Sequence, residues 1–233
     1  MAAGVGSVVM DARLVSICIG AVTLAATGFY YGVKFCQKGN YLIGVEWFAL
    51  AVSSTNFMVY ELTHWHVTYL GVLFLDTFSR AFGLPIVTVA GLTVLTHSFR
   101  PTIRVDVMLF VGTAVATLIL LMENFAPVLA YFLLAMWTLF TLFLFYFAYR
   151  LLVLREHYHA LGVSIAAISN QAIAYMYDFY KIPGDETNVI LNFYTIALFT
   201  WAYLTVQIYY SYCALGRATD RTTEGNLKRN LQS

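Results

Sequence analysis

Charged residues are scarce in this sequence. They make up 11% of its 233 residues, whereas a soluble domain usually carries about 25%. Hydrophobic residues account for 61%, and the mean hydropathy is +0.74. Too little polar surface remains to coat a water-soluble globule, so the composition excludes an ordinary soluble domain and predicts a membrane protein.

Cysteine is also rare, and neither sign of charge is in large excess. Cys18, Cys36 and Cys213 show no Cys-x-x-Cys or metal-type spacing, so no disulfide framework is predicted. His64 and His66 lie close together, but the sequence places no third metal ligand beside them. The net charge of +1 provides no basic face for nucleic acid. We therefore expect no bound metal, no cofactor and no nucleic-acid partner.

Long apolar runs are the main feature that is present. A helix needs about 20 apolar residues to cross a bilayer core about 30 Å thick, and seven segments qualify. They are Leu14–Phe35, Leu42–Leu62, Val67–Leu95, Val105–Met122, Ala126–Leu154, Ala160–Tyr180 and Val189–Leu215. The sequence thus predicts an all-α, polytopic membrane protein. It has a seven-helix transmembrane domain at residues 1–215 and a polar C-terminal tail at residues 216–233.

The basic residues give these segments an orientation. Most of the 13 lysines and arginines flank the first, third or fifth connection or lie in the tail. They are Lys34, Lys38, Arg100, Arg104, Arg150, Arg155, Arg217, Arg221, Lys228 and Arg229. The positive-inside rule therefore places the C-terminus in the cytosol and the N-terminus outside. Because the two termini then lie on opposite sides of the membrane, the number of spans must be odd, which agrees with seven.

A weak internal repeat relates the first two segments to the fifth and sixth, at an offset of about 117 residues. Glu61 matches Asp178 in this alignment. The third segment then pairs with the seventh, which places Asp76 near Asn192. The arrangement is a 3+1+3 parallel repeat, and such repeats place their sites at the repeat interface. Chance similarity between apolar helices is the alternative.

Five ionisable side chains within the predicted spans are candidates for function, because such groups are costly there and usually functional. They are Glu46, Glu61, Asp76, Arg80 and Asp178. The span directions place Glu61, Asp76 and Asp178 in one layer toward the outer leaflet, whereas Glu46 lies closer to the cytosol. A purely structural role remains the alternative to a functional one for four of these residues. Asp76 and Arg80 are four residues apart and can form an ion pair, and Glu61 and Asp178 can snorkel from helix ends.

Aromatic side chains gather at the level of these acids. In a dry pocket one carboxyl group can stay protonated as a general acid, aromatic faces stabilise cations, and exclusion of water protects reactive intermediates. Proton-initiated cyclisation of a prenyl chain through carbocations requires all three properties. We therefore interpret Glu61 and Asp178 as catalytic acids. The predicted substrate-binding side chains are Phe57, Tyr60, Asp76, Tyr175, Tyr177 and Asn192.

Two short motifs, NFMVYEL around Glu61 and YMYDFY around Asp178, resemble the acid motifs of the small seven-span integral-membrane terpene cyclases. This family includes fungal meroterpenoid and indole-diterpene cyclases and bacterial indole-sesquiterpene cyclases. The resemblance implies a cyclase (an isomerase or lyase) of terpenoid secondary metabolism that acts on a prenylated, lipid-soluble substrate. It would act in the plasma membrane of a bacterium or the endoplasmic reticulum of a eukaryote. Asn56, the candidate asparagine of the early motif, lies one position farther from Glu61 than the family pattern has it.

Three other classes of membrane protein share some of these features. A retinal-binding photoreceptor is excluded, because it needs a lysine in its last span and the segment Val189–Leu215 contains none. A small-solute transporter or channel remains an alternative, with Arg80, Asn170, Gln171 and Asn192 along its path. Against it, the first, fourth and fifth segments offer almost no polar lining. A non-catalytic membrane subunit also remains open.

Overall fold

The computed structural model describes residues 12–96 and 102–232, and every regular element in this part of the chain is a helix. The elements in chain order are α1 (Ala12–Gln37), α2 (Tyr41–Thr63), α3 (His66–Phe78), η1 (Ser79–Thr88), α4 (Val89–Thr96), α5 (Ile103–Leu120), η2 (Glu123–Phe125), α6 (Ala126–Val153), α7 (His157–Phe179) and α8 (Phe193–Gln232). Because α3, η1 and α4 form one continuous rod, each of the seven predicted segments corresponds to one long helix. The all-α class and the seven helices are thus confirmed.

Five helices in the described part of the chain are long and apolar enough to cross a membrane. They are α1, α2, the rod from α3 to α4, α5, and α6 together with η2. This finding supports a membrane protein. Helices α7 and α8 are not among the five, although both exceed the length that a span requires.

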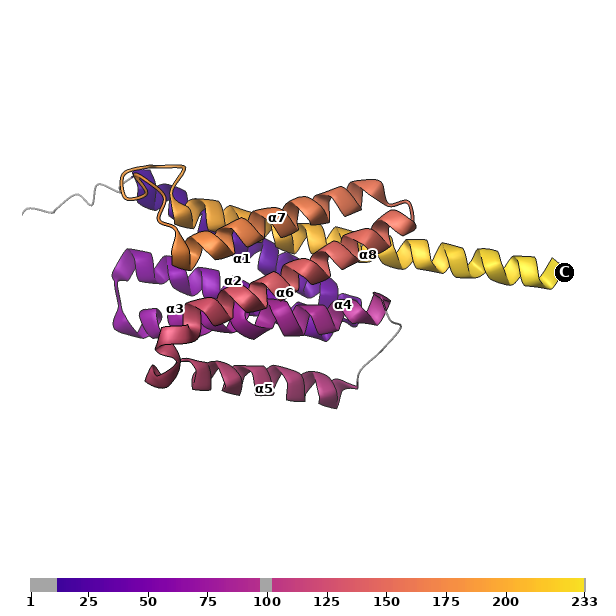
Figure 1. Ribbon diagram of the computed structural model, residues 1–233, viewed down its shortest axis with the longest axis horizontal. Helices are drawn as coiled ribbons and strands as arrows, with labels where there is room; N and C mark the ends of the chain where they lie inside the picture. Colours follow the sequence, from indigo (N-terminus) through magenta and orange to yellow (C-terminus); the bar gives the residue numbers. More distant parts are fainter. Residues whose placement is uncertain (1–11, 97–101, 233) are drawn as a thin grey trace, which may run out of the picture.

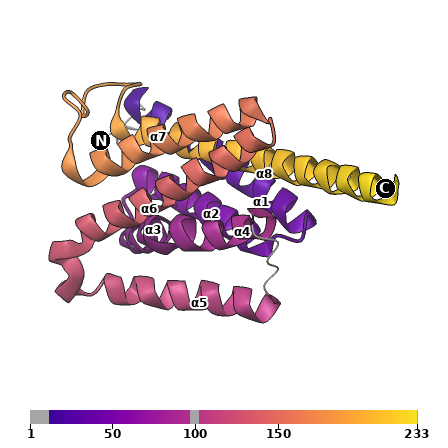
Figure 2. The same ribbon diagram turned by 45° about the vertical axis from the view of Figure 1, so that its right-hand side comes forward.

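The last helix differs from its predicted bounds. We expected a span at Val189–Leu215 followed by a separate tail, but α8 begins at Phe193 and continues to Gln232. Its final part projects beyond the other helices (Figures 1 and 2). The reason is that helix propensity does not require apolar residues: no proline interrupts positions 193–232, and Arg, Lys, Glu and Leu there are good helix formers.

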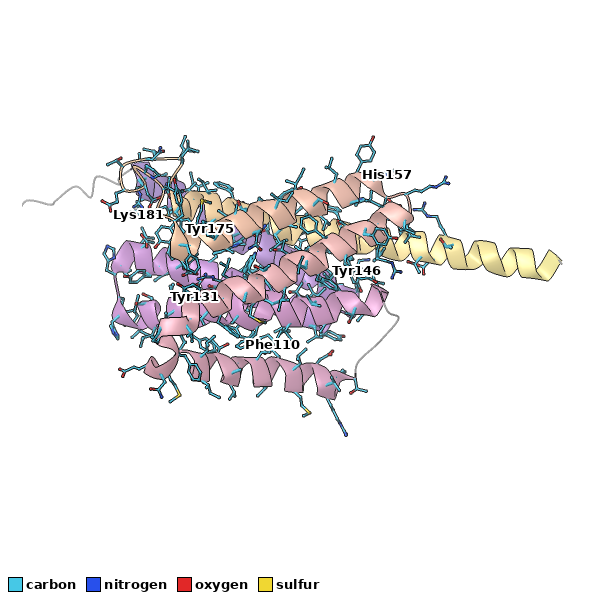
Figure 3. All side chains as sticks on the ribbon, viewed as in Figure 1. Phe110, Tyr131, Tyr146, His157, Tyr175 and Lys181 are labelled. Carbon is cyan, nitrogen blue, oxygen red and sulfur yellow. The ribbon has the colours of Figure 1, made fainter. Side chains whose placement is uncertain are left out.

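Long helices pack side by side in a bundle (Figure 1). Helix α1 packs against α2 and α8, and α7 packs against α6 and α8. Helix α5 lies at the edge of the bundle, where it contacts mainly α3 and η1. Phe110 on the bundle-facing side of α5 packs against Phe78, with ring centroids 5.2 Å apart (Figure 3).

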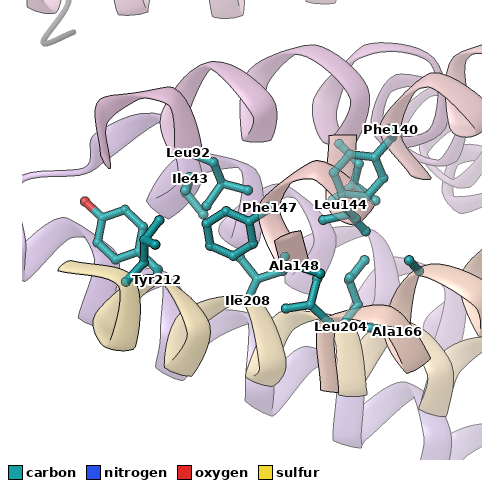
Figure 4. Close-up of a cluster of buried hydrophobic side chains, with 14 of the residues drawn as sticks. Ile43, Leu92, Phe140, Leu144, Phe147, Ala148, Ala166, Leu204, Ile208 and Tyr212 are labelled. Atoms are coloured by element: carbon teal, nitrogen blue, oxygen red, sulfur yellow. The ribbon is translucent and has the colours of Figure 1, made fainter. Parts of the chain in front are cut away.

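The main hydrophobic core takes side chains from α1, α2, η1, α4, α6, α7 and α8, and Figure 4 shows part of it. Ile43, Leu92 and Ile208 surround Phe147, and all four side chains are fully buried. Lipid tails are as apolar as these side chains, so helix association in a bilayer depends on close packing rather than on transfer out of water.

A glycine permits a close approach of α1 to α2. A Cβ atom at Gly28 would lie 2.8 Å from the Trp47 carbonyl oxygen and 2.9 Å from the Ala51 Cβ. No side chain fits into that space without a shift of one helix. Small residues at helix interfaces are typical of membrane bundles for this reason.

The continuous rod from α3 to α4 changes its helical geometry in the middle. Element η1 is a π-helix of ten residues, it contains Pro85, and most of its side chains are buried. Proline has no backbone N–H and its ring clashes with the preceding turn, so the regular α-helical pattern cannot continue through it. Such π-helical segments often occur at functional sites, and η1 forms part of the site described next.

Candidate functional site

A cavity of about 310 Å³ lies inside the bundle, and we call it the central cavity. Side chains from every long helix except α5 line it. They are Leu24, Leu50, Ser53, Ser54, Phe57, Tyr60, Glu61, Tyr69, Val72, Leu73, Asp76, Ser79, Arg80, Leu84, Trp137, Tyr177, Tyr194, Ala197, Leu198 and Trp201. Aromatic and aliphatic groups form most of the wall, and a few polar groups converge on it, as is typical of small-molecule sites.

One stripe of α2 forms a wall of the central cavity. Leu50, Ser54, Phe57 and Glu61 line the cavity, and their spacing of three or four residues places them on one helical face. The Ser54 hydroxyl is used within the bundle, since it donates a hydrogen bond of 2.9 Å to the Ala21 carbonyl. Glu61 remains the polar group of this stripe that faces the cavity.

Arg80 connects two acids at the edge of the central cavity. Its Nη1 atom lies 3.5 Å from Asp76 Oδ2, and its Nη2 atom donates to Asp178 Oδ2. The Tyr177 ring lies against the guanidinium, with its centroid 3.8 Å from Cζ. The Arg80 side chain is 5% exposed, whereas the two carboxylates are about one fifth exposed. A buried guanidinium is tolerated in such a site because it is paired and hydrogen-bonded.

The pairing of Asp76 with Arg80, expected from their spacing, is present, but Asp178 has a different environment from the one expected. Its carboxylate binds Arg80, and it is not among the side chains that line the central cavity. The acids that the cavity brings together are Glu61 and Asp76. Asp178 therefore contacts the lining of the cavity at Arg80.

The other predicted binding residues divide into two groups. Phe57, Tyr60, Asp76 and Tyr177 line the central cavity. Tyr175 does not line the cavity. It is two residues before Tyr177 on α7, and two residues of an α-helix rotate the side-chain direction by about 200°. It is 52% exposed and stacks on Phe179 instead, with ring centroids 5.8 Å apart (Figure 3).

Asn192 is buried outside the central cavity, where it caps α8. Its Oδ1 atom accepts a hydrogen bond of 2.9 Å from the Thr195 backbone N–H, and its Nδ2 atom donates to the Val189 carbonyl at 2.9 Å. Asparagine is one of the preferred residues at this position of a helix. Its place directly before an apolar helical run was a signal in the sequence for a cap.

Among the residues of the cavity wall that the sequence did not predict are two tryptophans, Trp137 and Trp201. Their rings lie 6.4 Å apart between α6 and α8, and both line the central cavity. In membrane proteins tryptophan concentrates at the two interfaces with water. A tryptophan in the middle of an apolar segment, as at these positions, was therefore the available signal for an interior role.

The charges around the central cavity do not balance. Glu61, Asp76 and Asp178 contribute three carboxylates, and Arg80 contributes one cation, which is paired with Asp76 and Asp178. The formal charge is about −2 when all four groups are ionised. Aromatic faces add further negative potential, so the site favours a positively charged species.

Within residues 12–96 and 102–232 no group of three or more His, Cys, Asp or Glu side chains is arranged to hold a metal ion. No protein-family model, no curated protein and no solved structure matches the chain.

Proposed function

We propose that the protein is a membrane-integral terpene cyclase that performs proton-initiated cyclisation of a prenylated, lipid-soluble substrate. The observation that carries the proposal is the central cavity itself, in which Glu61 and Asp76 face one space walled by aromatic rings. An acid starts such a reaction, and aromatic faces stabilise the carbocations that follow. The volume of about 310 Å³ lies at the lower end of the roughly 300–1,000 Å³ usual for small-molecule sites.

Glu61 is the general acid in this proposal. Its carboxyl group lines the cavity, and it is the cavity acid that does not share the ion pairs of Arg80 with Asp76 and Asp178. It transfers its proton to an alkene carbon or an epoxide oxygen of the substrate, which leaves a carbocation on the prenyl chain. The rings then close as alkene electrons attack successive cationic carbons.

Asp76 is the terminal base. Arg80 lies 3.5 Å from its carboxylate and offsets part of the cost of burying the ionised form. Loss of a proton from the last carbocation to Asp76 forms the product alkene, and capture by water is the other way to end the cascade. Asp178 and Tyr177 are positioning residues in this scheme, because both hold the Arg80 guanidinium.

The proposal includes all seven helices as membrane spans, with the N-terminus outside and the C-terminus in the cytosol. Helix α7 has 23 residues and is therefore about 34 Å long, which suffices for a bilayer core of about 30 Å. His157 and Lys181 lie at opposite ends of the bundle (Figure 3). The membrane would be the bacterial plasma membrane or the endoplasmic reticulum. The 3+1+3 repeat remains a prediction.

The test is cyclisation by the purified protein in lipid vesicles, supplied with a panel of prenylated aromatic compounds and their epoxides. We expect a cyclised product by mass spectrometry and NMR. Glu61→Gln should abolish it while membrane abundance is unchanged. Glu123→Gln alters an exposed acid before α6 and is the matched control. Wild-type turnover by Glu61→Gln, or no cyclised product from any compound, contradicts the proposal.

A second candidate function is the transport of a small organic cation. The formal negative charge of the cavity favours it, since such a site holds a stable ammonium ion as readily as a transient carbocation. Uptake of labelled organic cations into proteoliposomes distinguishes the two functions. Uptake that is lost in Glu61→Gln, together with no cyclised product, would favour the transporter.

A further inference from the structure

A buried acid lies directly beneath the central cavity and takes no part in the proposed reaction. Glu46 is on α2, one helical turn before Leu50, so it continues the stripe that forms the cavity wall. Its side chain is completely buried. Within the described part of the chain neither of its carboxyl oxygens has a hydrogen-bond partner.

The opposite side of this acid is formed by η1. A Cβ atom at Gly83 would collide with both carboxyl oxygens of Glu46, so the glycine provides the space that the carboxyl group occupies. Gly83 lies two residues before Pro85 within the π-helix. The irregular backbone of the rod and the buried acid therefore occupy the same place in the bundle.

An ionised carboxylate is not stable in these surroundings. Burial of an isolated charge without partners costs several kcal/mol, and such groups become neutral instead. Arg80 is the cation on the neighbouring turn of η1, but its guanidinium is bound to Asp76 and Asp178. Glu46 is thus expected to hold a proton.

One polar group connects this acid with the central cavity. The Ser79 hydroxyl lies beside the Glu46 carboxyl, and Ser79 is also a lining residue of the cavity. Its Oγ atom likewise has no hydrogen-bond partner among the described residues. A hydroxyl donates one hydrogen and accepts others. It can therefore take a proton from hydronium in the cavity while it passes its own hydrogen to Glu46.

We propose that Glu46 is a proton-binding site that exchanges its proton with the central cavity through Ser79. In the loading direction an O–H bond of hydronium breaks and a new O–H bond forms at Ser79 Oγ. The original Ser79 hydrogen moves to the carboxylate oxygen of Glu46, and water is left behind. Release is the reverse. The inference does not depend on the proposed cyclisation, because it concerns only protons and water.

Infrared spectroscopy of the protein in lipid vesicles tests this without any substrate. At neutral pH we expect the C=O band of a protonated carboxylic acid that is lost in Glu46→Gln and kept in Glu123→Gln. On transfer to D₂O the band should shift as deuterium replaces the proton. Ser79→Ala should slow that shift by about tenfold, which corresponds to about 1.4 kcal/mol in the barrier.

Two results would overturn the proposal. A carboxylate band in place of the acid band, in the difference between wild type and Glu46→Gln, would show that Glu46 is ionised. Exchange in Ser79→Ala at the wild-type rate would remove Ser79 from the route. If Glu46→Gln does not fold, Glu46→Asp keeps an acid at the site. The Glu46→Asp variant should then shift the frequency of the C=O band without removing the band. A C=O band at the wild-type frequency in this variant also overturns the assignment.

Discussion

The carboxylate of Asp178, at the end of α7, binds the guanidinium of Arg80 in η1, although the two residues are 98 positions apart. The pair fastens α7 to the rod that carries Asp76. It also holds Arg80 against the Tyr177 ring at the cavity wall. The geometry of the central cavity therefore depends on a contact between two helices that are distant in sequence.

Removal of the Asp178 charge should destabilise the bundle. Asp178→Asn leaves Arg80 with Asp76 alone, at 3.5 Å, and the lost charge-assisted hydrogen bond contributes about 1.5–3 kcal/mol. The melting temperature of the detergent-purified protein should fall accordingly. Glu186→Gln is the control, because Glu186 pairs with Lys181 on the surface where both side chains are about three quarters exposed, and no measurable change is expected.

The coupling of the two residues can be measured separately. The double variant Arg80→Met with Asp178→Asn should be less destabilised than the two single variants combined, by about 0.5–3 kcal/mol. The physical reason is that either single change already removes the contact between Arg80 and Asp178, so the double variant loses that contact only once. Strict additivity would show that the two groups do not interact.

Gly83→Ala should destabilise the protein by about 1–3 kcal/mol, because its Cβ overlaps the Glu46 carboxyl and overpacking forces neighbouring groups apart. Chemical unfolding of the reconstituted protein measures this. Gly112→Ala in α5 is the matched control. Nothing lies within 4 Å of a Cβ atom there, so the better helix propensity of alanine should leave stability equal or slightly higher.

A double variant checks that the contact between the new methyl group at position 83 and the Glu46 carboxyl group causes this loss of stability. Glu46→Ala removes the carboxyl group that the new methyl group meets, so the double variant Gly83→Ala with Glu46→Ala should regain part of the stability lost in Gly83→Ala. No recovery would mean that the methyl group is excluded by the backbone of α2 rather than by the acid.

Trp201→Phe should lower cyclisation and alter the ratio of products. Indole is the strongest cation-stabilising ring, and its loss removes about 0.5–2 kcal/mol of stabilisation from a carbocation beside it. That corresponds to a rate lower by about 2- to 30-fold. Gas chromatography with mass detection gives both rate and ratio. Trp65→Phe changes a ring that is 62% exposed and should leave both unchanged; equal effects would place the chemistry elsewhere.

The proposed seven spans predict which connections are accessible from each side. In a cysteine-free background, Thr187→Cys in the α7–α8 connection should react with a membrane-impermeant maleimide added outside intact cells. Tyr158→Cys at the start of α7 is 91% exposed and should react only after permeabilisation. Labelling of both positions from the same side would show that α7 does not cross the bilayer.

Much of the helical framework could be predicted because it depends on local sequence. Each apolar run is long enough to form a helix, and each is bounded by polar connections. The ion pair of Asp76 with Arg80 follows from a spacing of four residues on one helix. The α2 stripe that ends at Glu61 follows from helical periodicity in the same way.

Contacts between helices were not predictable in this way. The rotation of each helix about its axis is set by how its side chains pack against neighbours, and a small rotation decides whether a group faces the cavity or lipid. Tyr175 faces outward while Tyr177 faces the cavity. Asp178 binds Arg80 instead of standing opposite Glu61.

The sequence by itself determined that the chain forms seven helices, that most of its charge lies at their ends, and which acids lie within them. The tertiary structure alone decided which of those acids meet. It enclosed Glu61 and Asp76 in one aromatic cavity and left Glu46 buried beneath it without a partner. The physical reason is that a helix is stabilised by hydrogen bonds within a few residues, whereas a site depends on the close packing of several helices at once.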